Sequence, residues 1–313
     1  MTQGLGTNGE VSAAADLDPL PSKIKNPVTK IARRAVAVCT AIAIIFTLSA
    51  CRLGRDSVLR DRNVEPFNYD IALGAHQFHI EGYLTRSADP GRLPTLLVLN
   101  GSGERMDQCV GMSERVSTMG IHVACVNIPG YGKSSGPGRF AGPQSVEAAR
   151  RAFDMLSKRD DVDPNRIGVW GLGNGAVAAG LLMDSDTRPR AMILQSGAYD
   201  MVQFWPEAPL RTKLSILREV WPSKKALRRR DVIENMPERM DVSVLIMHGQ
   251  SDRRIPVKQA ARLADALRAR GAKVWTYYYP TASDDLGKRV EPELRNFLRE
   301  NLLEQGASTE AAS

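Results

Sequence analysis

Cysteine and histidine are scarce in this 313-residue chain, which holds four of each. No module that interleaves basic and aromatic residues in a nucleic-acid-binding pattern is present, so we expect no nucleic-acid partner. The composition, 43% apolar and 25% charged, is that of an ordinary globular protein, and no internal repeat is visible. The net charge of +7 is scattered over predicted helices, which favours general solubility with some attraction to anionic membrane surfaces. We expect no cofactor and no metal.

The first 50 residues are typical of an export signal and not of the fold. Five basic residues between 23 and 34 precede an apolar run over 35–50, which ends in Leu48-Ser49-Ala50-Cys51. This ending resembles a bacterial lipobox, in which the cysteine is lipidated and becomes the new N-terminus. The run is short against the roughly 20 apolar residues that usually span a bilayer. We therefore favour a lipoprotein signal, with an uncleaved membrane anchor as the alternative.

Either reading would place the chain from Cys51 onward outside the cytoplasm, anchored to a membrane of the bacterial cell envelope. Two cysteines then remain in the folded part, Cys109 and Cys125. Cys125 lies in a strand-like run and is expected to be a small buried apolar residue. An oxidising compartment permits a Cys109–Cys125 disulfide, although the spacing alone does not establish one.

Apolar runs alternate with amphipathic patterns along most of the chain. Strands are predicted over 67–73, 76–84, 94–99, 121–127, 166–170, 191–195, 242–247 and 273–279, and helices over 106–119, 145–158, 257–270 and 291–303. Apolar strands between helices predict a mainly parallel sheet covered on both faces, with the first two strands as an antiparallel addition at one edge. The fold class is therefore α/β.

One long segment interrupts the alternation and predicts a small helical cap over the carboxyl ends of the strands, at about 199–241. Its densest basic run, residues 223–230, indicates a solvated helix face and not an anion site. The predicted domains are a leader or anchor at 1–50, a linker at 51–66, one α/β domain at 67–304 with the cap inserted, and a disordered tail at 305–313.

The segment GVWGLGNGA, residues 168–176, predicts a strand, a sharp turn and a helix. Glycines stand two residues to either side of a central position, which is the layout of the G-x-S-x-G nucleophile elbow. The central residue is Gly173, which carries no side chain. The pattern therefore predicts an elbow without a nucleophile.

Three segments together carry a family resemblance. DPNRIGVWG at 163–171 leads into the elbow, VLIMHGQSDRRIP at 244–256 is similar to an acid-bearing strand and turn, and NIPGYGKS at 127–134 looks like a loop that begins with aspartate in the family. On these motifs the chain resembles the α/β-hydrolase superfamily over roughly 67–304. It looks closest to the dipeptidyl-aminopeptidase and acylaminoacyl-peptidase-like branch and its esterase neighbours.

The resemblance implies a catalytic triad, and this chain departs from it twice. It has Gly173 in place of the serine, keeps the acid as Asp252, and has Asp284 (or, with a one-residue shift, Asp285) in place of the histidine. Serine is a poor nucleophile until a base takes its proton, and the acid only orients that base. We therefore predict no hydrolysis of short acyl esters above background, and activity that stays weak when serine alone is restored at 173.

None of the four histidines is expected to replace the missing base. His248 ends the strand before Asp252 and is expected to be a packed or capping residue. The other three lie in or next to early strands: His76, His79 and His122.

An oxyanion-type site could persist without the triad. The resemblance places its two N–H donors at Asn174 and in the loop 100–103, represented by Gly101 and Ser102. Asn174 also begins a helix, where free N–H groups favour an anion. An empty structural turn is an equal alternative, and Ser102 and Ser134 are expected to be turn residues.

Asp252 and Asp284 should lie within hydrogen-bond reach of each other if the resemblance holds in detail. Two carboxylates that close predict either a raised pKa for one or a cation between them. Arg253 and Arg254 follow directly and favour the plainer reading, a structural ion pair.

Two functions remain open at this stage. The first is an exported, lipid-anchored, non-catalytic protein that binds a small acyl or anionic ligand, or a protein partner of unknown identity. The second is an active serine-type hydrolase of ester or peptide-like substrates with a non-standard nucleophile.

Overall fold

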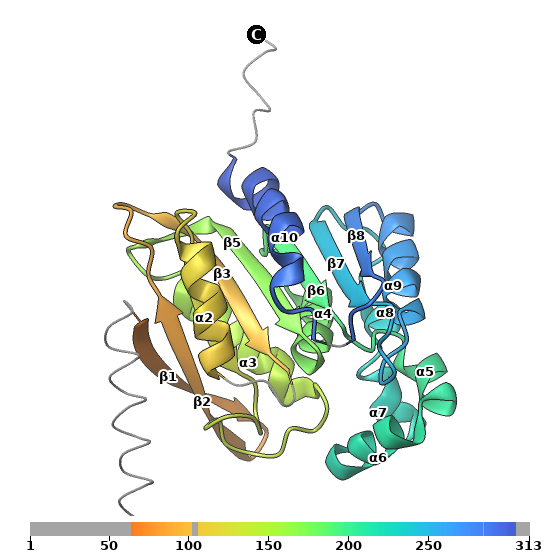
Figure 1. The fold of residues 1–313 in the computed structure, drawn as a ribbon. Coiled ribbons are helices and arrows are strands. Elements are labelled where there is room, and N and C mark those ends of the chain that lie inside the picture. Colours follow the sequence, from red (N-terminus) through yellow and green to blue (C-terminus); the bar gives the residue numbers. More distant parts are fainter. Residues whose placement is uncertain (1–63, 102–105, 284, 305–313) are drawn as a thin grey trace, which may run out of the picture. The chain divides into compact units, whose positions relative to one another are not determined.

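The computed structural model describes residues 64–101, 106–283 and 285–304 (Figure 1). The leader, Cys51, Ser102, Asp284 and the tail predicted from the sequence lie outside these residues. The described residues belong to one compact unit, Ser57–Ser313. Within them, no helix has both the length and the apolar character needed to cross a bilayer.

An eight-stranded sheet forms the centre of the unit, in the order β1-β2-β4-β3-β5-β6-β7-β8. The strands are β1 Val64–Leu73, β2 His76–Thr85, β3 Leu93–Asn100, β4 His122–Asn127, β5 Val162–Leu172, β6 Ala191–Gln195, β7 Ser243–Gly249 and β8 Lys273–Tyr279. The β1–β2 and β2–β4 pairs are antiparallel, and the other five pairs are parallel. The predicted sheet with an antiparallel hairpin at one edge is confirmed, and its first strand begins inside the predicted linker.

Helices cover both faces of the sheet, as predicted. They are α2 Met106–Ser117, α3 Pro143–Leu156, α4 Asn174–Ser185, α9 Lys258–Ala269 and α10 Glu291–Leu298, which follows the short turn η1 Gly287–Val290 and continues as η2 Arg299–Leu303. The sheet has a hydrophobic core on each face, and successive residues of one strand point into different cores because side chains alternate across a sheet. Leu97 of β3 packs with α3 and α4, whereas Leu96 and Val98 pack with α2 and α10.

The cap consists of four short helices between β6 and β7. They are α5 Met201–Glu207, α6 Leu210–Glu219, α7 Lys224–Arg228 and α8 Val232–Asn235. The cap has a small apolar core of its own, which includes Phe204, Ile216 and Leu227. In Figure 1, α5, α6 and α7 lie together beyond the sheet, with α6 at the outer end of the group.

The basic run at 223–230 is only partly the solvated face that the sequence predicts. Most of its cations are exposed, but Arg230 is buried. Its guanidinium donates hydrogen bonds to the carbonyls of Arg139, Phe140 and Ala226 at 2.7–3.0 Å. These hydrogen bonds to backbone carbonyls offset the cost of removing the Arg230 cation from water.

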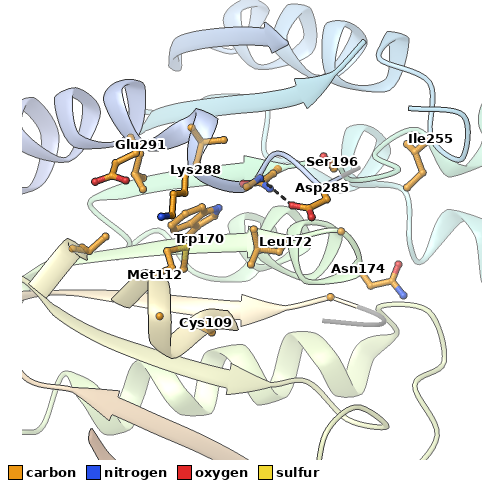
Figure 2. Close-up of a pocket in the computed structure, with 18 of the residues that line it drawn as sticks. Cys109, Met112, Trp170, Leu172, Asn174, Ser196, Ile255, Asp285, Lys288 and Glu291 are labelled. Atoms are coloured by element: carbon orange, nitrogen blue, oxygen red, sulfur yellow. Dashed lines mark hydrogen bonds between the residues drawn. The ribbon is translucent and has the colours of Figure 1, made fainter. Parts of the chain in front are cut away.

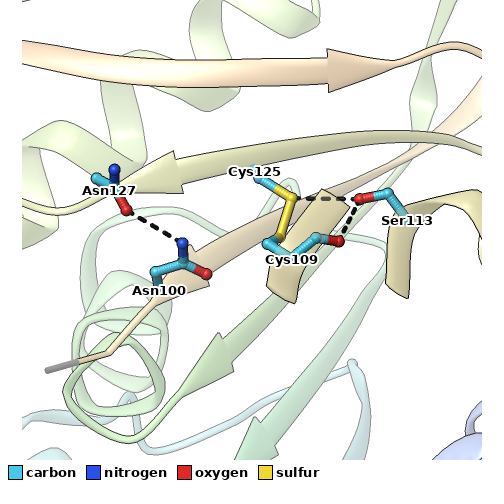
Figure 3. The surroundings of a disulfide bond; sticks show 5 residues. All are labelled: Asn100, Cys109, Ser113, Cys125 and Asn127. Atoms are coloured by element: carbon cyan, nitrogen blue, oxygen red, sulfur yellow. Dashed lines mark hydrogen bonds between the residues drawn. A yellow bond between two sulfur atoms is a disulfide. The ribbon is translucent and has the colours of Figure 1, made fainter. Parts of the chain in front are cut away.

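Cys109 and Cys125 form a disulfide that the sequence left open (Figure 3). Cys109 lies on α2 and Cys125 on β4, with Cα atoms 6.3 Å apart, within the range that disulfides span. Cys125 is fully buried, as predicted, but its sulfur is cross-linked and is not merely apolar filling. Ser113 Oγ lies 3.3 Å from Cys125 Sγ, one helical turn along α2. The bond therefore fixes the first half of α2 to the sheet.

Candidate functional site

The elbow predicted from the sequence is present between β5 and α4. Gly173 occupies it with φ 54° and ψ −114°, and its N–H donates to the Gln195 carbonyl at 2.9 Å. A Cβ built at 173 would point into open space, with Gly101 Cα the nearest atom at 3.9 Å. By contrast, a Cβ on Gly171 or Gly175 would overlap backbone atoms of α4 or β3. The flanking glycines are thus required by close packing, whereas position 173 has room for a side chain and lacks one.

The predicted acid, Asp252, is bound within its own turn after β7. Its Oδ1 accepts the N–H groups of Arg254 and Ile255 at 2.7 and 2.9 Å, and its Oδ2 lies 3.5 Å from His248 Nε2. Burial acts to raise the pKa of Asp252, but these partners outweigh it and hold the pKa below its ordinary value. His248 Nε2 donates to the Ile255 carbonyl at 2.8 Å. His248 is wholly buried, which confirms the prediction of a packed histidine.

The loop after β8 brings a carboxylate to the cavity that the elbow also lines. Asp284 lies outside the described residues, so its expected contact with Asp252 stays a prediction. Its neighbour Asp285 lines the cavity described below, and its Oδ1 accepts the Gly287 N–H at 2.9 Å. All four histidines of the chain lie in the described residues, and none of them lines this cavity.

The oxyanion-type residues that the structure describes do come together. A Cβ on Gly101 would lie 3.2 Å from Asn174 N, so the loop after β3 runs directly past the start of α4. The Asn174 side chain is held from the other side, because its Nδ2 donates to the Tyr131 hydroxyl at 2.9 Å. That hydroxyl donates in turn to the Glu219 carboxylate of the cap at 2.9 Å.

The asparagine that replaces the family's aspartate has a structural role. Asn127 accepts a hydrogen bond from Asn100 Nδ2 at 3.1 Å and donates to the buried Glu81 carboxylate at 2.9 Å. Ser134 Oγ donates to the Asn127 carbonyl and accepts the Glu81 N–H, which confirms that it is a turn residue. The hydroxyl of Ser134 is therefore committed to two backbone partners.

A cavity of about 590 Å³ extends from the elbow beneath α2 and α10. Figure 2 shows Trp170 and Met112 toward one end of it and Asn174 and Ile255 toward the other. The apolar lining gathers around Met112, Val116, Trp170, Leu172, Val290 and Leu294, and the elbow end carries Gly173, Asn174, Gln195 and Ser196. Four cations and two carboxylates also line the cavity: Arg115, Arg254, Lys288, Arg295, Asp285 and Glu291. Because Arg115 pairs with Glu291 at 3.1 Å, the remaining charge is mainly positive.

The cap shapes one wall of this cavity by holding residues 139–141, which we call the left-handed segment. Its three residues have φ values of 45–51°, unusual for side chains other than glycine. Glu219 accepts a hydrogen bond from the Phe140 N–H at 2.6 Å, and the Arg230 guanidinium donates to the carbonyls of Arg139 and Phe140. Phe140 itself lines the cavity. The two cap residues thus position a cavity wall that the sequence did not indicate.

Ser196 is another cavity residue that the sequence analysis missed. It follows β6 directly, has φ 53°, and is buried beside the elbow. The signal in the sequence was a serine placed immediately after a buried strand, at the carboxyl edge where sites of parallel sheets form.

Comparisons with known proteins agree with this architecture. The model of the prolyl oligopeptidase family matches residues 115–289, more than half of the chain. An uncharacterized protein of Mycobacterium tuberculosis is 28% identical over 240 residues, covering 75% of this chain and 74% of that protein. An uncharacterized peptidase of Bacillus subtilis is 25% identical over 158 residues, covering 49% of this chain but only 24% of that protein.

Solved structures share the fold at low identity. The acylaminoacyl peptidase of Pyrococcus horikoshii superimposes with a TM-score of 0.62 at 14% identity, covering 79% of this chain and 43% of that one. Acetyl xylan esterase 1 from Thermoanaerobacterium gives 0.58 at 15% identity, covering 76% and 88%. The chain thus spans less than half of the larger peptidases and most of the esterase. It belongs to the prolyl oligopeptidase family and has the α/β-hydrolase fold.

Proposed function

We propose that this chain is an exported, lipid-anchored family member that binds a small acyl or anionic ligand, or a protein partner, without hydrolysing it. The observation that carries the proposal is the elbow itself. Position 173 keeps the backbone geometry and the open space of a nucleophile site but has no side chain, and no histidine lines the cavity. Without a nucleophile and a base, acyl transfer loses the groups that form and release the covalent intermediate.

The cavity supports ligand binding. Its volume of about 590 Å³ falls within the range of small-molecule sites. Two buried atoms of its lining residues, Trp170 Nε1 and Gln195 Oε1, have no hydrogen-bond partner within the described residues. Buried polar atoms are normally paired, so a ligand that shifts these two side chains slightly would gain an otherwise unpaired donor and acceptor. An apolar body with a carbonyl or anionic head would match the Trp170 end, the elbow and the mainly positive lining.

The anchor and the compartment are supported separately. Cys51 stands where a lipobox requires it, and a disulfide in the domain suits an oxidising compartment such as the cell envelope. Mass spectrometry of the membrane-extracted protein should find acyl groups on Cys51 and no preceding residues. An intact N-terminus would instead favour the uncleaved anchor.

Catalytic inactivity is tested on the purified full chain with short acyl esters and aminoacyl anilides. Turnover should equal the buffer background, and robust turnover would refute the proposal. Ligand binding is tested by thermal shift with medium-chain carboxylates. Met112→Trp fills the cavity and should abolish the thermal shift. Met155→Trp is the control and should retain it, because Met155 is a half-buried methionine on α3 that packs in the core on the other face of the sheet.

A second candidate, an active serine-type hydrolase with a non-standard nucleophile, rests on Ser196. Its left-handed φ and its place at a strand end in the cavity lining are features that a nucleophile turn shares. A fluorophosphonate probe separates the two functions. Labelling that is lost in Ser196→Ala and kept in Ser215→Ala, a second serine of the cavity, would favour the hydrolase. The first proposal expects no labelling of any serine.

A further inference from the structure

The outward face of α6 is apolar and exposed. Leu210, Leu214 and Leu217 are 73%, 49% and 40% exposed, and Trp221, just past the helix end, is 79% exposed. Residues at spacings of four and three lie on one side of a helix, so the three leucines form a continuous stripe. We call these four residues the α6 stripe. Single exposed leucines are ordinary, but a contiguous apolar patch marks an interaction surface.

The opposite face of α6 is fixed to the domain. Ile216 is fully buried in the cap core, and Thr212 donates a hydrogen bond to the Arg254 carbonyl at 3.0 Å. Thr212 and Ser215 also line the cavity. The helix is therefore held by its inner side, and burying the stripe needs no rearrangement of the helix.

Positive charge borders the stripe. Arg211 and Arg218 lie along one side of it and Lys213 along the other, as the 100° turn per residue requires. The exposed residues Lys224, Lys225, Arg228 and Arg229 continue the charge beyond the helix end. Between residues 210 and 229 there are seven lysines and arginines and one acid, Glu219. That acid is already engaged with Tyr131 and Phe140.

We infer that the α6 stripe docks on the surface of an anionic lipid bilayer. A helix face of leucine and tryptophan bordered by lysine and arginine is the composition of interfacial helices, which bury the apolar side among the lipids and place the cations at the headgroups. A second copy of the chain is a poorer occupant, because two equally basic borders would meet and repel. A bilayer would contact the apolar α6 stripe with its acyl chains and the surrounding cations with its anionic headgroups.

Docking would also place the cavity next to the membrane. Thr212 and Ser215 face the cavity from the same helix whose other side carries the stripe. A helix is about 10 Å across, so the cavity wall would lie about one helix diameter from the headgroups. The inference depends neither on lipidation of Cys51 nor on inactivity at Gly173, and it adds a second membrane contact to any N-terminal anchor.

The test uses the full chain and the fluorescence of Trp221. With vesicles of mixed phosphatidylglycerol and phosphatidylcholine, Trp221 emission should shift to the blue and be quenched by brominated acyl chains, and Trp221→Phe should remove that signal. Leu214→Ser combined with Leu217→Ser should weaken partitioning about tenfold, because it removes two of the exposed leucines. Leu73→Ser is the matched control, since Leu73 is an exposed leucine at the end of β1. It should leave quenching unchanged.

Charge is tested in the same assay. Lys224→Glu combined with Lys225→Glu should lower binding to the anionic vesicles by about fivefold for each basic residue lost, with little effect on pure phosphatidylcholine. Lys158→Glu combined with Lys273→Glu, at two exposed lysines outside the cap, is the charge-matched control and should change binding little.

Three results would overturn the inference. The first is equal quenching in the wild type and the Leu214/Leu217 double variant, which would mean that another part of the chain makes the contact. The second is no quenching on anionic vesicles. The third is burial of Trp221 that rises with protein concentration in the absence of lipid, which would assign the stripe to a second copy of the chain.

Discussion

Breaking the Cys109–Cys125 bond should lower the free energy of unfolding by about 3 kcal/mol. The cross-link spans 16 positions of the sequence. A loop of this length removes about 10 cal/mol/K of entropy from the unfolded chain, which corresponds to about 3 kcal/mol at 25 °C. For a domain of this size such a loss should lower the Tm by about 6 °C.

Thermal denaturation followed by circular dichroism measures the effect, in wild type with and without a phosphine reductant. The double variant Cys109→Ala with Cys125→Ala should reproduce the reduced protein and not respond to the reductant. Ser113→Ala serves as the control, because it alters the packing beside Cys125 Sγ and keeps the cross-link. Its Tm should fall much less than that of the double variant.

The prediction also has a local part. α2 carries five residues of the cavity lining, from Cys109 to Val116. Freeing this helix from β4 should therefore weaken ligand binding more than the loss of global stability alone would explain. If reduced protein with two more titratable thiols than the oxidised protein melts within a degree of it, the entropic argument is refuted.

Four further variants test the elbow, the cap and the acid turn. Gly173→Ser should show at most weak ester turnover in an enzyme assay, because no histidine lines the cavity, and robust turnover would contradict the reasoning. The same variant should lose about 1–2 kcal/mol in urea unfolding because of the left-handed φ at this position. Gly175→Ala should lose about 3 kcal/mol in urea unfolding, since its Cβ meets the β3 backbone. Arg230→Met should lower the free energy of unfolding by about 2–3 kcal/mol and weaken ligand binding, because it leaves the carbonyls of residues 139 and 140 without their donor. The control Arg229→Met, at an exposed neighbour, should change stability by less than about 0.5 kcal/mol. Equal effects of the two variants would contradict the role of the buried guanidinium. Asp252→Asn should be less stable than wild type at neutral pH and equally stable in acid. The pKa of Asp252 in the folded protein lies below the ordinary value of 3.8, so its ionised form contributes stability above pH 3.8 that disappears as the pH falls through the folded pKa. A stability difference that stays constant in acid would contradict this.

The sheet and its covering helices could be read from the sequence because local pattern determines them. The predicted ranges 191–195 and 273–279 are β6 and β8 as found, and glycines at 171 and 175 located the turn into α4. At these positions the alternation of apolar runs and the need for close backbone approach leave few alternatives.

The parts that could not be predicted depend on contacts between distant segments. The Cys109–Cys125 distance follows from how α2 packs on β4, and cysteine spacing carries no information on that. Arg230 looks like its exposed neighbours in sequence, and only the carbonyls of the left-handed segment, about 90 residues away, distinguish it. Ser196 has a left-handed φ although it is not a glycine, so the sequence did not indicate this backbone conformation.

The unequal roles of the three elbow glycines have an evolutionary consequence. A serine at 173 would hold a left-handed φ at a cost of about 1–2 kcal/mol, which glycine avoids. Replacement of a nucleophile by glycine at this turn therefore favours stability, and the flanking glycines keep the turn's shape because packing, and not chemistry, selects them. Rebuilding a serine triad would be harder. It would need both a serine and a histidine, and the serine alone lowers stability before the triad is complete.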